Sequence, residues 1–227
     1  YSVYGLAFAL TKVLVEDGDH IRIGSTYSKH LAQSMIETLE TVCANHLNRA
    51  FNASYLGGDG KALIANDHPD IAGGAAGANS RSNLLTTSAA LSQTSLEQML
   101  IQIRQAEDPR GKKIRVSPKK LVVAPGNMLT AEVLLKSVLR AGTNNNDLNP
   151  VKSMGLLSDV AVLSRLTSAT AWFVQTDAPE GIKVLWRRKT EKAMEGDFET
   201  DSVRYKSTMR FGSGWTDWRA MFGTSGT

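Results

Sequence analysis

Apolar residues recur with a helical period in one long segment near the start of the chain. Between Ser25 and Ala50 they return every three or four positions, which predicts one long amphipathic helix. Its apolar stripe consists of Leu31, Met35, Leu39, Val42, Cys43 and Leu47. Neither glycine nor proline interrupts the segment. At ~1.5 Å per residue, a helix of ~25 residues is about 40 Å long.

Both ends of the chain have the alternating pattern of strands. Residues 1–15 are rich in β-forming apolar residues and predict a strand, with a polar turn at 16–19. Near the other end, apolar and polar residues alternate over 203–211, and this period of two predicts a half-buried strand. A further strand is expected over 182–188, where the same alternation begins.

The middle of the chain mixes short elements. Helices are predicted over 94–105 and 128–141, and the first has a capping-box signature in Thr94 and Glu97. Residues 51–83 are crowded with glycine and predict a long, loop-rich connection. Short strands are expected at 114–116, 121–124, 160–163 and 171–174. This order indicates an α+β fold, and the similar character of the two ends indicates a middle domain inserted into a discontinuous one.

Composition narrows the class of protein. A chain of 227 residues with 42% hydrophobic and 21% charged residues is long and apolar enough for a folded core. No apolar run approaches the ~20 residues of a membrane helix, so we expect no membrane partner. The single cysteine, Cys43, excludes a disulfide framework and a thiolate zinc site. The net charge of +4 is compatible with a surface that faces nucleic acid, although such a balance is common in proteins that touch no DNA.

Two candidate motifs, a phosphate-binding loop and a metal site, do not match the patterns that these functions require. The glycine-rich stretch that ends at Lys61 resembles a phosphate loop, but Ala62 stands where a serine or threonine should follow the lysine. Asp67, His68 and Asp70 are conceivable metal ligands, yet a turn in which the aspartates cap their own backbone is the favoured interpretation. We therefore expect no metal and no cofactor.

Two further groups have a functional and a structural interpretation. Cys43 and His46 lie three positions apart on the predicted long helix, as a nucleophile and its base would, but Cys43 belongs to the apolar stripe, which favours packing. The aromatic residues Trp215, Trp218 and Phe222 are suited to stacking nucleic-acid bases, and a place in the core or in a subunit contact is the favoured alternative. No set of residues in the sequence matches a known catalytic arrangement, and we expect that the protein is not an enzyme.

Four stretches, in order along nearly the whole chain, match the pattern of a known family. The first is Tyr4–Thr11, followed by Glu16-Asp17, and the second is Asp59–Leu63, followed by Asn66–Pro69 and a later asparagine. The third is Lys120–Pro125, followed by a helix near Leu129. The fourth is Trp172-Phe173, followed by the closing segment Arg204–Arg219. In these stretches the sequence resembles the major capsid proteins of tailed phages, especially the Mu-like major head subunit family.

The resemblance implies a tailed-phage major capsid fold with a peripheral domain, built from a long spine helix and a long β-sheet, and an inserted axial α/β domain. It assigns residues 1–15 to the returning strand of an extended hairpin loop, 16–113 and 178–227 to the peripheral domain, and 114–177 to the axial domain. The family also has an N-terminal arm. Since the first residue is Tyr1 rather than methionine, we expect the sequence to begin inside a longer reading frame.

The function that the resemblance implies is self-assembly, as pentamers and hexamers, into the icosahedral head shell that encloses phage double-stranded DNA. The implied location is the virion capsid, assembled in the host cytoplasm, with portal, scaffold and decoration proteins as further partners and non-specific DNA at the inner face. Expected inter-subunit contacts, with ordinary surface turns as the alternative, are Asp67, His68, Pro69, Asn144, Asn145 and Asn146. The alternative functions are an encapsulin-type compartment shell, which shares the fold, and a soluble ligand-binding domain.

Overall fold

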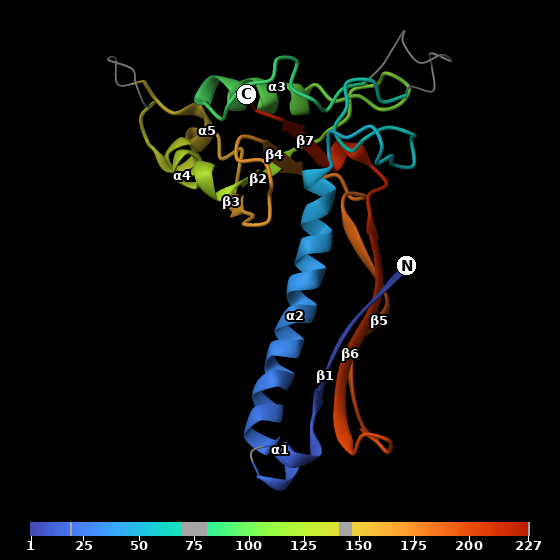
Figure 1. Ribbon diagram of the computed structural model, residues 1–227. Coiled ribbons are helices and arrows are strands. Elements are labelled where there is room, and N and C mark those ends of the chain that lie inside the picture. The colour runs from blue at the N-terminus through green and yellow to red at the C-terminus, as the bar shows by residue number, and fades with distance from the viewer. Residues whose placement is uncertain (19, 70–80, 141–146, 227) are drawn as a thin grey trace. The chain divides into compact units, whose positions relative to one another are not determined.

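The computed structural model describes residues 1–18, 20–69, 81–140 and 147–226 (Figure 1). Its elements, in chain order, are β1 (Ser2–Leu10), α1 (Lys12–Glu16), α2 (His20–Asn48), α3 (Gln93–Arg104), β2 (Pro118–Val123), η1 (Pro125–Asn127), α4 (Met128–Lys136), α5 (Pro150–Ser153), β3 (Asp159–Val162), β4 (Trp172–Thr176), β5 (Lys183–Asp197), β6 (Ser202–Gly214), η2 (Trp218–Ala220) and β7 (Met221–Thr224). This mixture of helices and sheets confirms the predicted α+β class.

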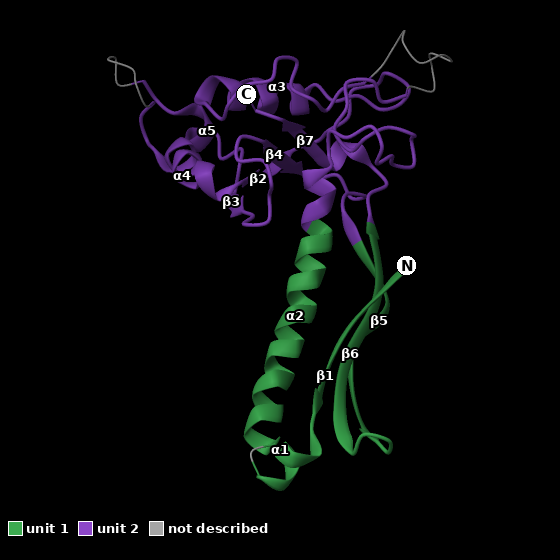
Figure 2. Cartoon of the chain, in the orientation of Figure 1, with its two compact units in different colours: residues 1–43, 184–213 green, residues 44–183, 214–227 purple. Residues whose placement is uncertain are grey.

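The chain divides into two compact units, coloured separately in Figure 2. Unit 1 consists of residues 1–43 and 184–213, and unit 2 consists of residues 44–183 and 214–227. These boundaries differ from those of the expected peripheral and axial domains. Because the words peripheral and axial refer to positions in an assembled shell, a single chain does not test that assignment, and it stays a prediction.

Unit 1 is a long helix packed against one face of a three-stranded sheet. The strand order is β1-β6-β5, and β1 runs antiparallel to β6 with Ser2 opposite Phe211 and Leu10 opposite Val203. The small core of this unit contains Met35 from α2 and Met209 and Phe211 from β6. Tyr4, Leu39, Val42 and Val184 pack around these residues and are partly buried. The predicted long helix and the predicted strand over 203–211 are therefore confirmed.

The opposite face of this sheet is open. Along β6 the buried residues Ser207, Met209 and Phe211 alternate with the exposed Arg204, Lys206 and Arg210. Nearly every residue of β5 is exposed. This edge strand continues to Asp197, well past the predicted end at 188, because a strand that lies in solvent accepts the charged residues that follow.

The start of the chain differs from its prediction. The strand ends at Leu10, and residues 12–16 form the short helix α1. The long helix begins at His20 and continues through Gly24, a residue that usually weakens helices. A Cβ at position 24 would be in ordinary van der Waals contact with Leu10 at 3.4 Å and with the Tyr205 hydroxyl at 3.6 Å, so the packing does not require glycine here. The helix includes Gly24 because packing of its apolar face stabilises it as a whole.

Unit 2 is built around a four-stranded sheet in the order β3-β2-β4-β7. Strands β2 and β3 are parallel, whereas β4 runs antiparallel to β2 and β7. Leu121 and Val123 of β2 belong to one buried cluster, which includes α3, while Val122 between them belongs to a second cluster. Since both faces are covered, these strands read in the sequence as continuous apolar runs instead of alternating ones.

Several local features of unit 2 differ from their predictions. Residues 114–116 form no strand, and Ile114 instead donates its backbone N–H to the Ala106 carbonyl at 3.1 Å. The capping box of α3 uses Ser92 and Ser95 in place of Thr94 and Glu97. The short helix α5 and the strand β7 were not predicted.

Helix α4 ends at Lys136, five residues before the predicted end at 141. Ser137 has an extended ψ of 135°, and the Asn149 side chain takes over the carbonyls at this helix end. Its Nδ2 donates to Leu134 O at 2.8 Å and to Ser137 O at 3.1 Å. A residue distant in sequence thus terminates the helix.

We expect Phe211→Ala to lower the free energy of unfolding by about 3–5 kcal/mol, because it empties the small core of unit 1. Phe211 is 1% exposed and stacks on Tyr4 at 5.0 Å between ring centroids. The matched control is Phe198→Ala, at a phenylalanine that is 97% exposed, which should change stability by less than about 0.5 kcal/mol. Urea titration followed by circular dichroism checks both variants, and equal effects would contradict the packing described for this unit.

Candidate inter-subunit surface

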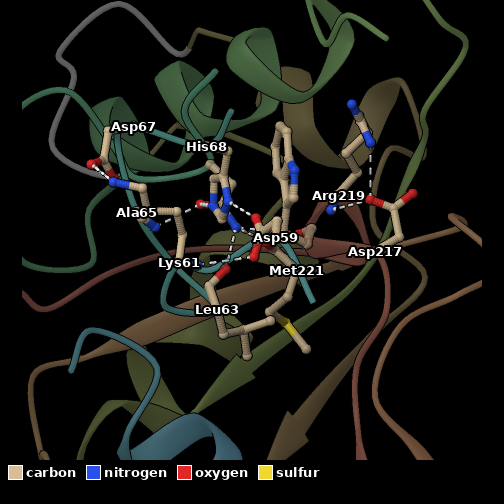
Figure 3. Close-up of polar contacts among 11 residues, drawn as sticks. Asp59, Lys61, Leu63, Ala65, Asp67, His68, Asp217, Arg219 and Met221 are labelled. Atoms are coloured by element: carbon tan, nitrogen blue, oxygen red, sulfur yellow. Dashed lines mark hydrogen bonds and ion pairs between the residues drawn. The ribbon is translucent and has the colours of Figure 1, made fainter. Parts of the chain in front are cut away.

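The predicted contact residues of the glycine-rich stretch have different environments. Asp67 is half exposed and forms an ion pair with Lys61 (Figure 3). Pro69 is exposed. His68, between them, is 0% exposed. Asn144, Asn145 and Asn146 lie outside the described residues. A single chain does not test the contact role of any of these residues, so that role stays a prediction.

His68 is held on all sides by its own chain. Its Nδ1 lies 2.6 Å from Asp59 Oδ2 and its Nε2 lies 3.0 Å from Asn83 Oδ1. Its backbone N–H and carbonyl pair with the carbonyl and N–H of Arg81, both at 3.0 Å. The imidazole is therefore fully used inside the subunit, and its structural effect is to fix the exposed residues on either side.

Asn83 is the centre of this buried network. Its Nδ2 donates to the carbonyls of Leu63, Trp218 and Met221 at 2.7, 3.2 and 2.8 Å. Its Oδ1 accepts from the Ala65 N–H at 2.9 Å and from His68. One buried side chain thus joins the loop before it to the closing segment of the chain. An unpaired buried polar group is costly, so these bonds specify the arrangement strongly.

The amide orientation of Asn83 also dictates the hydrogens on His68. Because Asn83 Oδ1 can only accept, His68 Nε2 must donate to it. His68 Nδ1 faces the Asp59 carboxyl, and an ionised carboxylate is likewise an acceptor. Both ring nitrogens of His68 therefore have a polar partner within the subunit, Asp59 on one side and Asn83 on the other.

Trp218 covers one face of the His68 ring. The two rings stack with their centroids 4.3 Å apart and an interplanar angle of 7°. The Arg219 guanidinium also lies over the Trp218 ring, at 4.5 Å from its centroid. Arg219 in turn donates to the Glu107 carbonyl at 3.1 Å and to Asp217 Oδ1 at 3.2 Å, the latter shown in Figure 3. A favourable cation–π contribution from the Arg219 guanidinium is expected here.

The neighbouring Glu107 side chain forms ion pairs with Arg81 and Lys113. A hydrogen bond from the Lys113 ammonium, assisted by the charge of Arg81, holds the pKa of Glu107 below its usual value. A carboxyl with a lowered pKa stabilises the fold above its unfolded-state pKa, and this contribution is lost as the pH falls through the lowered value.

The glycines of the 57–61 segment form a turn. The Gly57 N–H donates to the Lys61 carbonyl at 2.7 Å, and Gly60 has a left-handed φ of 73°. Asp59 Oδ1 accepts the Lys61 N–H at 3.1 Å, while its other oxygen faces His68. The glycines that resemble a phosphate loop thus have a structural role. They form the turn that places Asp59 against His68.

The environments of Cys43, His46 and the closing aromatic residues favour structural roles. Burial, assisted by the charge of Glu40, raises the pKa of the Cys43 thiol, which disfavours the nucleophilic thiolate. Burial, assisted by Arg49, lowers the pKa of His46, whose ring lies edge-on to Trp215 at 5.5 Å between centroids. Trp218 and Phe222 belong to the core, which confirms the structural interpretation for this pair.

Within the described ranges, the structure contains neither a trio of metal-ligating side chains nor a helix long and apolar enough to span a membrane. Sequence reasoning missed Asn83 as the centre of this network, and it did not foresee that Trp218 stacks on His68. The signal for Asn83 was the family pattern, in which an aspartate, a His-Pro pair and a later asparagine recur in order. Asp59, His68 and Asn83 meet in the folded chain, which gives that spacing a physical reason.

Comparison with known proteins places this geometry in a family. No curated protein matches the sequence. Among solved structures, a chain from Mycobacterium phage Patience is similar at 9% identity, with a TM-score of 0.58 over 98% of this chain and 70% of that one. The capsid structure of cyanophage P-SCSP1u is similar at 11% identity, with a TM-score of 0.55 over 99% of this chain and 72% of that one.

The holo-SrpI encapsulin complex from Synechococcus elongatus PCC 7942 is also similar, at 12% identity, with a TM-score of 0.50 over 98% of this chain and 72% of that one. At these identities the likeness concerns the fold alone. The family model described as "Phage capsid protein" matches residues 2–223, almost the whole chain. The chain therefore belongs to the phage capsid protein family.

Proposed function

We propose that this chain is the major capsid protein that tiles the icosahedral head of a tailed phage around double-stranded DNA. The observation that carries the proposal is the capsid family match over residues 2–223. The physical support is the incomplete burial of unit 1, whose sheet has one covered and one open face. Such a surface is suited to being covered by neighbouring copies.

Self-association explains exposed apolar residues that a monomer leaves in water. In unit 1 these include Val3 and Leu6 on β1 and Leu185 and Met194 on β5. Burying apolar surface contributes ~25 cal/mol per Å² before the cost of association. Many modest contacts, repeated by symmetry in pentamers and hexamers, then stabilise a closed shell.

The turn at residues 66–69 is a contact surface in this proposal. Asp67 and Pro69 face solvent, and the buried His68 holds them in place. His68 therefore acts as a positioning residue. Asn144, Asn145 and Asn146 remain proposed contacts near a symmetry axis.

Charge supports a DNA-facing surface. The net charge is +4, and Arg204, Lys206 and Arg210 are exposed on one face of β6. Contacts of this kind bind phosphate without reading sequence and weaken as salt rises. The proposal also includes portal, scaffold and decoration proteins as partners, assembly in the host cytoplasm, a final location in the virion, and a structural, non-enzymatic role.

An encapsulin-type compartment is the second candidate, and the structural likeness to an encapsulin complex is the observation that favours it. The two functions differ in the enclosed cargo. A shell that contains DNA supports the phage function, and a shell that contains a protein cargo supports the compartment.

We expect the complete gene product to form closed particles of uniform diameter, visible by negative-stain microscopy and eluting in the void volume of a size-exclusion column. Particles purified from cells that produce the phage should hold nucleic acid that resists nuclease. A stable monomer whose melting temperature rises with a small ligand would favour the soluble-domain alternative instead.

The 66–69 turn gives a second test. Asp67→Ala combined with Pro69→Ala should reduce particle yield and change the free energy of unfolding by less than about 1 kcal/mol, because both residues are exposed. His68→Ala should destabilise the subunit itself, by about 1–3 kcal/mol for each buried group left unpaired. Thermal melts and particle counts on both variants check this, and normal particle yield from the double variant would exclude a contact at this turn.

A further inference from the structure

A fully exposed aromatic residue stands in the turn that joins β5 to β6 in unit 1 (Figure 1). Phe198 directly follows the last residue of β5 and is 97% exposed. Aromatic side chains often anchor protein interfaces, because they bury a large apolar area when a partner covers them. A single exposed apolar residue is ordinary by itself, so the surroundings of Phe198 decide its role.

The turn holds Phe198 in a defined position. The Thr200 hydroxyl donates to Asp197 Oδ2 at 2.8 Å. Asp201 has a left-handed φ of 51°, and its carboxylate forms an ion pair at 2.7 Å with Lys12 of α1. An unfavourable backbone angle persists only where other contacts hold it. The turn therefore presents an ordered aromatic ring, which loses little conformational entropy when a partner covers it.

Charge is unevenly distributed along this hairpin. Residues 195–201, at the turn, contain four acidic and no basic residues, whereas residues 183–192 of β5 contain five basic and one acidic residue. Two of the four acids form ion pairs within the subunit. Glu195 and Glu199 pair with no basic side chain in the described part of the chain. The turn therefore carries unpaired negative charge on both sides of the exposed phenylalanine.

The other end of the sheet presents apolar side chains on its open face. Val3 of β1 is 61% exposed and lies opposite Arg210, a residue of the open face of β6. Val184 of β5 packs against the covered core. Because successive side chains of a strand point to opposite faces, the next residue, Leu185, points to the open face, where it is 56% exposed. A partner at this end of the sheet therefore meets apolar surface.

Two arginines accompany these apolar residues. Arg187 follows Leu185 on the same face of β5, and its guanidinium carbon lies 5.9 Å from the centroid of the Tyr1 ring. Neither Arg187 nor Arg210 forms an ion pair with a carboxylate of the described residues. The stem patch, which consists of Val3, Leu185, Arg187 and Arg210, thus combines apolar side chains with unpaired positive charge.

A subunit cannot place its own turn on its own stem patch. The strand β5 is continuous from Lys183 to Asp197, so the 13 positions from Leu185 to Phe198 span ~40 Å at ~3.3 Å per residue. Each copy of the chain carries both surfaces in equal number. A second copy is therefore the partner that matches the apolar residues and the charges of both.

We propose that the Phe198 turn of one copy docks on the stem patch of a neighbouring copy. The phenylalanine ring covers the apolar residues of the patch, and the carboxylates of Glu195 and Glu199 meet its arginines. The inference rests on the proposed self-assembly and names one pair of surfaces that join copies. The apolar contact provides the burial, and the opposite charges select the orientation.

Charge reversal tests the contact in the complete gene product. Arg187→Glu and Glu199→Arg should each raise the subunit concentration needed for particle assembly by at least about tenfold, which corresponds to ~1.4 kcal/mol. The two substitutions together should restore assembly to within about threefold of the unmodified chain, because opposite charges then meet again. The matched control is Lys29→Glu, at an exposed base of α2 outside both surfaces, which should assemble normally.

The apolar part of the contact is tested at Phe198. Phe198→Ser should also raise the assembly concentration by at least about tenfold. The melting temperature should stay near that of the unmodified chain, because the side chain is exposed in the subunit. The matched control is Ile21→Ser, at an apolar residue of unit 1 that is 73% exposed, which should assemble normally.

Cross-linking tests the geometry directly. In a Cys43→Ala background, Phe198→Cys and Leu185→Cys in one chain should give covalent oligomers when a short bis-maleimide is added to particles. The separation of ~40 Å along β5 prevents a link within one copy. Phe198→Cys alone is the control and should give no oligomers. Covalent dimers from this single variant would show that turns meet one another, and would overturn the contact.

The outcomes separate the two proposals. Normal particles from Arg187→Glu, Glu199→Arg and Phe198→Ser would overturn the turn-and-stem contact and leave the shell function standing. Normal particles that lose their nucleic acid in Arg187→Glu would overturn it as well, because the arginine would then face DNA. So would two defective single charge variants whose combination is no better, since the charges would then act at separate contacts. If the unmodified gene product forms no particles, the shell function itself fails, and this contact with it.

Discussion

A layer of secondary structure needs a second layer to cover it, and unit 1 supplies this for one face of its sheet only. The α2 helix packs on β6 through Met35, Met209 and Phe211, while the alternate residues of β6 remain in water. In unit 2 the sheet is covered on both faces by two separate clusters. The contrast explains why unit 2 contains most of the buried core and why unit 1 leaves apolar and basic residues available to partners.

In unit 2, the buried polar network around Asn83 fixes the conformation of an irregular segment. Residues 57–69 have little regular structure, so backbone ladders do not fix their conformation. Asn83, His68 and Asp59 fix it instead, because each buried polar group finds its partner in only one arrangement. The irregular segment thereby has one fixed conformation. A surface that is to make the same contact in every copy of a shell must have such a fixed conformation.

Both features suit a subunit that assembles with copies of itself. Exposed apolar side chains in each unit are individually ordinary, but their repetition by symmetry multiplies a small contribution into a stable shell. The family assignment and the physical description agree on a protein whose surface is completed by copies of itself.

The sequence by itself determined the long elements. The stripe from Leu31 to Leu47 predicted α2, and the alternation over 203–211 predicted β6, since periodicity reports directly which face of an element is buried. The order of these elements was sufficient for the α+β class, and four short sequence stretches in order carried the resemblance to capsid proteins.

Only the tertiary structure decided what depends on residues far apart in the chain. Asn149 ends α4 earlier than helix propensity predicts, and Asn83, bonded to Trp218 and Met221, encloses His68, which the sequence had placed at the surface. Local pattern carries no information on such partners, because a side chain's hydrogen bonds and burial arise from chain segments that meet only on folding. The periodic elements were therefore predictable, and the buried polar network was not.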